Sequence, residues 1–412
     1  MKKLFYPAES IENRISFYML LCFLLTLPFD RFYSTITLIC FLIHSLIYFR
    51  KERFRQVGKE TFILQSVFWV SVLASLYAPS WNGASNTISK QLAIFLFPVL
   101  LAVSPLDLLK YRSKLLAGFA IGCTGTVLYL FADALHVIRF DNLPLSALLS
   151  HAFVNQNFSL PLDLHATYFS MMLGIALVFC FGQALTKATG ARRLGYVIVV
   201  LIMAAGLAQL SSKSVFIALF IVVNGVIPWY LLESKKRVRY LLIAVPISVI
   251  LVLLILTVPV FKERILIDLK KDLQKAPETE NLSWRRGRWD VSMNLIRRSP
   301  IIGNGTGSEI PMLRELYFER KMYSAYLAPL NVHNQFLSFL INSGIIGLLV
   351  YLGTLLWGFW LALKRKDLML LTFMLLILSV SFSEDILDVN KGIFIYAFFF
   401  SFLVLSGKKL TA

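Results

Sequence analysis

Residues 240–261 read YLLIAVPISVILVLLILTVPVF, a run that contains no charged side chain. A helix needs about 20 mostly apolar residues to cross the hydrocarbon core of a bilayer, and this run is long enough to do so. The run predicts a membrane-spanning helix, and the rest of the chain follows the same plan.

The composition of the chain excludes a water-soluble globule. Hydrophobic residues make up 58% of the 412 residues and charged residues only 16%, against roughly 45–50% and 25% in soluble domains. The formal net charge of +18 raises the question of nucleic-acid binding. However, the basic residues occur in short clusters between apolar runs, as anchoring charges do in membrane proteins. We therefore expect membrane lipids, and no nucleic acid, among the partners of the chain.

Apolar runs recur along the whole chain and predict about twelve membrane-spanning helices. They lie near residues 14–29, 32–49, 61–78, 88–105, 115–137, 165–186, 195–211, 214–232, 240–261, 335–362, 368–383 and 393–406. The predicted fold is an all-α polytopic membrane protein in three parts. These are residues 1–261 with nine spans, a large loop at 262–332, and residues 333–412 with three spans.

The loops between the predicted spans alternate in charge. One set carries basic clusters, such as those at 50–59, 110–114 and 364–366, whereas the short loops of the other set hold few basic residues. Cytoplasmic loops of membrane proteins are enriched in Lys and Arg. The alternation therefore predicts that both termini are cytoplasmic and that the large loop lies on the opposite, external side.

The large loop has helical patterning. An apolar stripe that recurs every four residues consists of Phe261, Ile265, Leu269 and Leu273. It predicts a helix that Pro277 ends. A second helix is expected at 283–298, before a glycine-rich turn at 303–307, and a third at about 310–326. Such helices would cover the outer surface of the membrane.

His333 follows the large loop and opens the tenth predicted span. An imidazole can take a proton near neutral pH, which makes His333 a candidate catalytic base. The alternative is an interfacial histidine that caps the start of a helix. Gly344 and Gly347 follow at a spacing that lets another helix approach closely.

Cationic residues on the external side are candidates for binding a phosphate. Lys213, between the seventh and eighth spans, could neutralise a phosphate or simply reach the lipid headgroups. The large loop carries the run Trp284-Arg285-Arg286-Gly287-Arg288-Trp289. Its guanidinium groups suit a diphosphate because they bind phosphate oxygens in a bidentate fork, and the alternative is a solvated basic face. We expect Arg288 to point away from Arg285, so that at most two of the three arginines share one ligand.

Two further groups of polar residues lie at span ends. His165 and Tyr168 begin the sixth predicted span and could contact a substrate. Glu384 and Asp385 lie between the last two spans, and for these acids we favour a structural role. The sequence contains no carboxylate and histidine cluster with metal-site spacing and no nucleotide-binding or serine-hydrolase motif. We therefore expect neither a metal nor a cofactor.

Taken together, these residues resemble the O-antigen ligase and polymerase family of bacterial envelope glycosyltransferases. The family pattern has a late His, then Asn, Ser or Gln, nine residues, Gly, two residues, and Gly, Thr or Tyr. The residues that fit it are His333, Asn334, Gly344 and Gly347. A second family pattern, with Arg, an aromatic residue, Pro and a glycine-rich turn, is matched by Arg285, Trp289, Pro300, Gly303, Gly305 and Gly307. One departure is that Lys213 and Ile217 stand where members commonly have an Arg, three residues and a Leu.

The resemblance implies a GT-C-like fold and transfer of a glycan from undecaprenyl diphosphate to an acceptor hydroxyl. The reaction would be metal-independent and inverting, at the periplasmic face of the bacterial inner membrane. His333 and Arg285 would be catalytic. The residues expected to bind substrate are Lys213, Arg286, Arg288, Asn334, His165 and Tyr168.

The resemblance does not determine the acceptor. We favour a ligase that acts on the lipid A core. The alternatives within the family are a polysaccharide polymerase and a protein O-oligosaccharyltransferase. A flippase for lipid-linked oligosaccharides is the alternative from another class. It is disfavoured because the informative charges lie outside the bilayer, whereas a flippase needs charges along a route through it.

Overall fold

The computed structural model describes residues 10–49, 51–54, 57–268, 270 and 285–407. This part of the chain is helical for the most part and contains no strand, which confirms the predicted all-α polytopic class. The principal helices are α2 (Ile11–Thr26), α3 (Arg31–Ile47), α5 (Lys59–Ser75), α6 (Trp81–Val103), α7 (Leu108–Phe140), α9 (Ala166–Thr186), α10 (Gly190–Leu210), α11 (Lys213–Ile221), α12 (Ile227–Leu231), α13 (Ser234–Thr257), α19 (Gln335–Arg365), α20 (Leu368–Ser381) and α21 (Asn390–Leu405). Shorter segments between them are α4 (Lys51–Phe54), η1 (Leu145–Leu149), η2 (His151–Phe153), α8 (Gln156–Ser159), η3 (Leu160–Leu162) and the π-helical η4 (Val222–Val226).

Each of the twelve predicted spans overlaps one of the principal helices or the continuous run from α11 to α12. Within the described residues, seven helices are long and apolar enough to cross a membrane: α6, α7, α9, α10, Lys213–Leu231, α13 and α19. Shorter apolar helices occur at Phe32–Ile47, Leu368–Ser381 and Asn390–Leu405. The chain is a multi-pass membrane protein, and the full count of twelve crossings stays a prediction.

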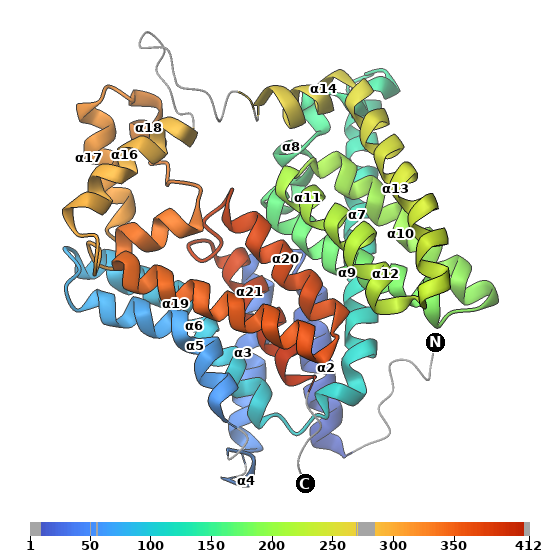
Figure 1. The fold of residues 1–412 in the computed structure, drawn as a ribbon, viewed down its shortest axis with the longest axis horizontal. Helices are drawn as coiled ribbons and strands as arrows, with labels where there is room; N and C mark the ends of the chain where they lie inside the picture. Colours follow the sequence, from blue (N-terminus) through green and yellow to red (C-terminus); the bar gives the residue numbers. More distant parts are fainter. Residues whose placement is uncertain (1–9, 50, 55–56, 269, 271–284, 408–412) are drawn as a thin grey trace.

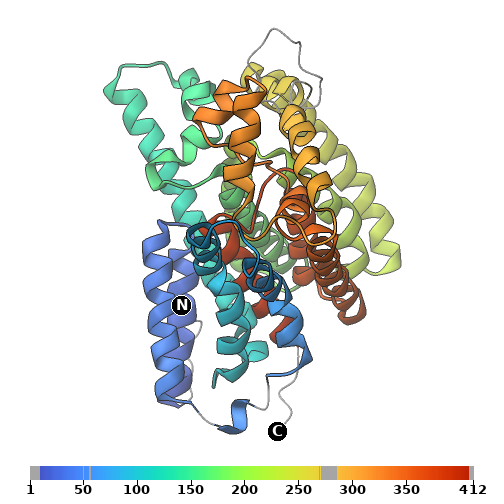
Figure 2. The same cartoon turned by 90° about the vertical axis from the view of Figure 1, so that its left-hand side faces the viewer.

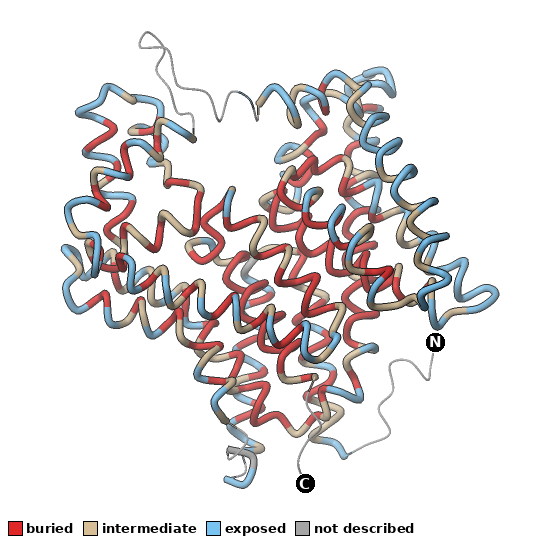
Figure 3. Tube along the Cα trace, viewed as in Figure 1, coloured by how far each residue is buried: buried red, intermediate tan, exposed pale blue. Residues whose placement is uncertain are grey.

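The core of the bundle is built on α9 and α21 (Figure 3). Nearly all residues of these two helices are buried, and apolar side chains occur all round them, as expected for helices that have no polar face. Phe399 of α21, for example, packs edge-on against Phe119 of α7 at 4.9 Å between ring centroids. By contrast, α13 has no buried residue at all. The most apolar run of the sequence therefore forms a peripheral helix whose surface suits lipid.

The two ends of the bundle differ in chemistry. At one end Arg112 makes two hydrogen bonds of 2.7 Å to the carboxylate of Asp367. At the same end Arg365 donates to Glu60 (3.2 Å) and to the Val404 carbonyl (2.6 Å). Helices α16 to α18 of the large loop lie at the opposite end (Figures 1 and 2). The charge alternation in the sequence thus corresponds to two faces of the molecule.

The described part of the large loop is helical. Its elements are α14 (Pro259–Lys262), the π-helical η5 (Glu263–Ile267), α16 (Arg285–Arg298), α17 (Glu309–Glu319) and α18 (Tyr323–Leu327). The prediction of one helix at 310–326 is wrong, because the chain leaves the helix after Glu319 and Lys321 takes a left-handed φ of +58°. Other residues of the predicted helices lie outside the described residues, namely Leu269, Leu273, Pro277, Ser283 and Trp284.

A glycine-rich turn fastens the large loop to α19. The helix is interrupted at Gly344, with φ +62°, where residues 299–305 cross it. A Cβ on Gly303 would lie 2.5 Å from the backbone of Ser343, and one on Gly344 would collide with the Ile301 carbonyl. Backbone hydrogen bonds join the two segments from Asn304 to Ile341, Gly305 to Asn342 and Ile345 to Pro300. The close approach expected at Gly344 is therefore made by a loop and not by a helix.

Candidate active site

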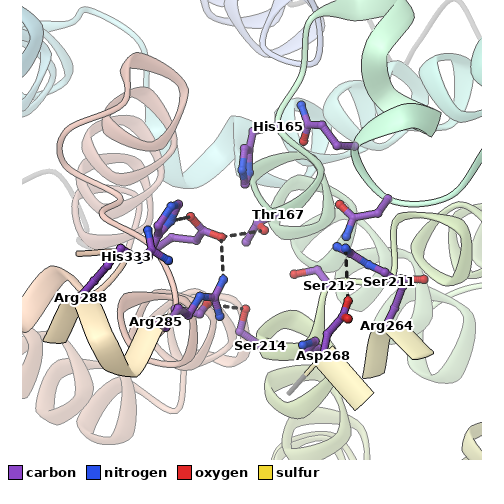
Figure 4. Close-up of a pocket in the computed structure, with 15 residues that line it drawn as sticks. His165, Thr167, Ser211, Ser212, Ser214, Arg264, Asp268, Arg285, Arg288 and His333 are labelled. Carbon is purple, nitrogen blue, oxygen red and sulfur yellow. Dashed lines mark hydrogen bonds and ion pairs between the residues drawn. The ribbon is translucent and has the colours of Figure 1, made fainter. Parts of the chain in front are cut away.

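A cavity of about 610 Å³ opens at the end of the bundle that carries α16 (Figure 4). Its walls come from the start of α9, the junction of α10 and α11, the segment after α14, the start of α16, and the loops before α19 and α21. It is lined by Asn155, Gln156, His165, Thr167, Ser211, Ser212, Lys213, Ser214, Arg264, Asp268, Arg285, Arg288, His333, Ser383 and Glu384. All of these side chains are polar or charged, which suits a sugar or a phosphate.

His333 lies in the loop before α19, and its side chain contacts the loop between α20 and α21. Its backbone is left-handed, with φ +47°, directly before Asn334, which caps α19 by accepting the N–H groups of Phe336 and Leu337. The Nδ1 atom of His333 lies 3.0 Å from Oε2 of Glu384. When Nδ1–H donates to a carboxylate, Nε2 is left as the basic nitrogen. This is the arrangement that a general base needs.

Glu384 links His333 to the cationic wall of the cavity. Its Oε1 atom lies 3.8 Å from the Arg285 guanidinium and accepts a hydrogen bond of 3.4 Å from Thr167. Burial raises the pKa of Glu384, but the hydrogen bond from His333 and the charges of His165, His333 and Arg285 outweigh it and hold the pKa below its usual value. The carboxylate therefore stays ionised at neutral pH and orients His333 and Arg285 together.

Cationic groups line the cavity on two sides. Arg285 and Arg288 come from the first turn of α16, on the same side as His333 (Figure 4). Arg264 of η5 lies on the other side, where it forms an ion pair of 3.5 Å with Asp268 (Figure 4). Lys213, the first residue of α11, also lines the cavity. Guanidinium and ammonium groups that face one another across such a space can bind two linked phosphates.

His165 stands beside Thr167 at the start of α9 (Figure 4). Its Nδ1 atom is buried and has no hydrogen-bond partner among the described residues. Burial lowers the pKa of His165; the charge of Glu384 opposes this effect, whereas the charges of His333 and Arg285 add to it. The ring is therefore neutral at neutral pH and can exchange a hydrogen bond with a substrate hydroxyl.

Residues 198–352 match the family model described as O-antigen ligase. The matched segment, which is less than half of the chain, is similar to the O-antigen ligase family. This confirms the resemblance drawn from the sequence motifs. No curated protein matched the chain. Members of the O-antigen ligase family are glycosyltransferase-like enzymes, and the family implies lipid-linked glycan substrates and a membrane context.

The O-antigen ligase match includes four of the cavity residues that the sequence singled out, Lys213, Arg285, Arg288 and His333. These residues are up to 120 positions apart along the chain and are joined here by one cavity. His165 and Glu384 lie outside the matched residues. The cavity is therefore lined by side chains from inside and outside the matched segment.

The predicted site residues divide into two groups. Those that line the cavity are His333, Arg285, Lys213, Arg288 and His165. Arg286 is exposed and does not line it. Asn334 and Tyr168 are buried behind it, the first as a helix cap and the second with its hydroxyl donating to the Asp385 carbonyl at 3.4 Å. The functional roles of all eight residues stay predictions.

The prediction that Arg288 points away from Arg285 is wrong. Both side chains line the cavity, because residues three positions apart on a helix share a face. Arg288 is also 5% exposed and donates a hydrogen bond of 2.9 Å to the Asn331 carbonyl. It therefore ties α16 to the segment that precedes His333. With Arg286 outside the cavity, two of the three arginines can reach one ligand.

Sequence reasoning favoured a structural role for Glu384, and the structure places its carboxylate in the cavity wall beside His333 and Arg285. A signal for this was present, since acids between two apolar runs are costly to bury and often serve a function. Arg264 and Asp268 were not singled out at all. They lie within the apolar stripe of the large loop, whose pattern indicates only an amphipathic helix.

Proposed function

We propose that the chain is a ligase-type glycosyltransferase that moves a glycan from undecaprenyl diphosphate to a hydroxyl of the lipid A core. The reaction takes place at the periplasmic face of the bacterial inner membrane. The observation that carries the proposal is the cavity that His333, paired with Glu384, lines together with Arg285 and Lys213. A base beside a set of cations is what attack on a sugar with an anionic leaving group requires.

His333 acts as the general base. Its Nε2 takes the proton of the acceptor hydroxyl while the hydroxyl oxygen forms a bond to the anomeric carbon. The bond from that carbon to the diphosphate oxygen breaks, and the diphosphate leaves with the electron pair. Glu384 holds the ring through Nδ1 and stabilises the imidazolium that forms. Because the attacking and leaving oxygens are on opposite faces of the carbon, its configuration inverts.

Arg285 and Lys213 stabilise the charge that develops on the departing diphosphate. Arg285 can bind two phosphate oxygens at once, whereas Lys213 acts as a point charge. Arg264 lines the same cavity as Lys213 and adds a guanidinium to a site where Lys213 replaces the Arg that members of the family commonly have. These cations supply the charge neutralisation that a divalent metal provides in other glycosyltransferases, so the proposed reaction is metal-independent.

The lipid A core is proposed as the acceptor because the matching family model is described as O-antigen ligase. A second lipid-linked repeat or a protein hydroxyl would need the same base and the same leaving-group contacts. An assay can therefore identify the acceptor. The purified protein is given a lipid-diphosphate glycan together with one acceptor at a time: the lipid A core, a second lipid-linked repeat, or a peptide.

We expect transfer to the lipid A core by the wild-type protein and none by His333→Ala, which should still bind the donor. Arg285→Ala should weaken donor binding and lower turnover by about 10²- to 10³-fold, by analogy with the loss of one oxyanion donor. Arg297→Ala is the matched control, because Arg297 is an exposed arginine in the last turn of the same helix. It should behave as the wild type.

The results that would contradict the proposal are specific. Full turnover by His333→Ala removes the base, and unchanged donor affinity in Arg285→Ala removes the diphosphate contact. Ladders of increasing length with the lipid-linked acceptor would assign a polymerase instead. Transfer to a peptide alone would assign a protein glycosyltransferase.

A further inference from the structure

Three carboxylates that are not part of the cavity lining meet beside the backbone of His333. Glu309 of α17 and Asp385 and Asp388 of the loop between α20 and α21 each offer an oxygen within 4.8 Å of the others. Glu309 is 3% exposed and Asp385 is 1% exposed. Three negative charges cannot be held so close together in a buried site without neutralisation.

Two of these acids hold the backbone on either side of His333. Oδ1 of Asp385 accepts the Asn334 N–H at 2.7 Å, and Oε1 of Glu309 accepts the Val332 N–H at 3.1 Å. His333 itself has a left-handed φ of +47°, a conformation that costs free energy in residues other than glycine. The two carboxyl groups therefore fix the direction in which the imidazole enters the cavity.

The hydrogen bonds also indicate where a proton resides. Glu309 accepts from three donors, since its Oε2 takes hydrogen bonds from Ser338 Oγ and Asn342 Nδ2 in addition to the bond at Oε1. That pattern favours an ionised carboxylate. Oδ2 of Asp385 is buried and accepts no hydrogen bond from any described residue. A buried oxygen of this kind is satisfied if it carries a proton and donates it to a neighbouring carboxylate.

The electrostatic surroundings of Asp385 support this assignment. Burial, reinforced by the charges of Glu309, Asp388 and Glu384, raises the pKa of Asp385 well above its usual value, although the Asn334 N–H lowers it. Burial also raises the pKa of Glu309 to about 7. The other titratable groups that face Asp385 are Tyr168 of α9, whose hydroxyl donates to the Asp385 carbonyl, and Tyr317 of α17. Burial raises the pKa of Asp388, and the charge of Lys90 of α6 opposes this effect.

We propose that Asp385 is a positioning residue for His333 and works as a neutral carboxylic acid, with Oδ1 accepting the Asn334 N–H and the Oδ2 proton shared with Glu309 and Asp388. This inference rests on the proposed function for its effect on turnover but not for the protonation itself. It follows that an amide can replace the acid, because Asn keeps both the acceptor oxygen and a donor.

The activity test compares Asp385→Asn with Asp385→Ala. We expect Asp385→Asn to retain turnover within about tenfold of the wild type, and Asp385→Ala to lose a further 10- to 100-fold, roughly the effect of losing buried hydrogen bonds. The loss should fall on kcat and leave KM for the donor nearly unchanged, because the residue acts through His333. Asp141→Asn, an exposed acid at the end of α7, is the matched control and should match the wild type.

The pH profile separates positioning from a purely structural role. Above the pKa of the cluster the shared proton is lost, the carboxylates repel one another and turnover falls. Asp385→Asn removes one of these acids, so its alkaline limb should shift to higher pH. An unshifted alkaline limb, or equal kcat in Asp385→Asn and Asp385→Ala, would overturn the proposal.

An infrared measurement tests the proton independently of any transfer reaction. At neutral pH the wild type should show the carbonyl stretch of a protonated carboxylic acid, and this signal should weaken in Asp385→Asn but not in Asp141→Asn. Equal signals in the three proteins would overturn the proposal even if transfer is observed. A melting temperature that rises with added Mg²⁺ in the wild type but not in Asp385→Asn would also overturn it, because a cation would then neutralise the cluster.

If the wild type transfers no glycan to any acceptor, the proposed function fails while the infrared comparison still decides the state of Asp385.

Discussion

The charges of the cavity residues depend on one another. Glu384 is ionised because His333 and Arg285 stabilise its negative charge more than burial opposes it. His165 is neutral because burial disfavours its imidazolium more than Glu384 favours it. One carboxylate thus supports one basic histidine, and the second histidine is left as a neutral hydrogen-bonding group.

The neutral state of His165 has a consequence for stability. Its pKa in the folded protein lies below the ordinary value of 6.5, so the unfolded chain binds the proton first as the pH falls. The stability that the neutral ring allows is complete above about pH 6.5 and is lost as the pH drops through the folded pKa. We expect the melting temperature of the wild type to fall more than that of His165→Gln between about pH 7.5 and pH 5.

The control for this prediction is His151→Gln. His151 is 64% exposed, with Glu263 at 3.1 Å, so its replacement should leave the pH dependence of melting close to that of the wild type. Parallel melting curves for the wild type and His165→Gln across the whole range would show that His165 is not held neutral.

At the scale of the element, the interruption of α19 at Gly344 joins the large loop to the helix that follows His333. A continuous helix would leave no gap for residues 299–305, which cross α19 at Gly344 and link it to the end of α16. Arg285 at the start of α16 and His333 just before α19 are therefore set by the same junction. The backbone hydrogen bonds lost at the kink are replaced by bonds to the crossing loop. A break in a membrane helix is tolerated when its backbone groups find other hydrogen-bond partners in this way.

Gly344→Ala should destabilise the protein by about 2 kcal/mol or more, because a side chain there combines a left-handed φ with a collision against the Ile301 carbonyl. Gly353→Ala in the same helix is the matched control. A Cβ at Gly353 meets no atom within 4 Å, so alanine should be neutral or stabilising by about 0.5–1 kcal/mol. Thermal melting in detergent measures both. Equal melting temperatures would show that the kink does not depend on glycine.

At the scale of the whole molecule, the two faces of the bundle have different tasks. At the basic end, ion pairs join one helix to another. Examples are Arg112 with Asp367 and Arg365 with Glu60. The other end holds α16 to α18 and the cavity. By the positive-inside rule we expect the basic end to face the cytoplasm, and the proposed function requires the cavity to lie on the opposite, periplasmic side.

This orientation predicts which positions a membrane-impermeant thiol reagent reaches in intact cells. In a variant without the native cysteines, Leu327→Cys should be labelled, because Leu327 is 74% exposed on the α16 to α18 side. Lys187→Cys, an exposed position at the end of α9 in a basic loop, should be labelled only after the inner membrane is permeabilised. The reverse pattern would invert the topology and move the proposed active site to the cytoplasm.

Much of the architecture could be predicted from the sequence because it depends on local properties. Length and hydrophobicity of each apolar run decide whether a helix can cross a membrane, so the twelve predicted spans all overlap helices. Short-range geometry was harder. The break at Lys321 and the shared face of Arg285 and Arg288 escaped the sequence reasoning, although the second follows from the spacing of residues on a helix. The division of the chain at 262 and 333 stays a prediction.

Only part of the candidate site could be predicted from the sequence. His333 and Lys213 stood out because a charged or titratable group at the end of an apolar run needs a reason. Arg285 stood out because it lies in an arginine-rich run that suits a diphosphate. Their convergence, and the pairing of His333 with Glu384 and of Asn334 with Asp385, depends on how helices distant in the chain pack together. Sequence by itself determined an α-helical membrane protein with its candidate chemistry at one face. Only the tertiary structure decided which side chains share a cavity, because distances between loops are set by the packing of the whole bundle.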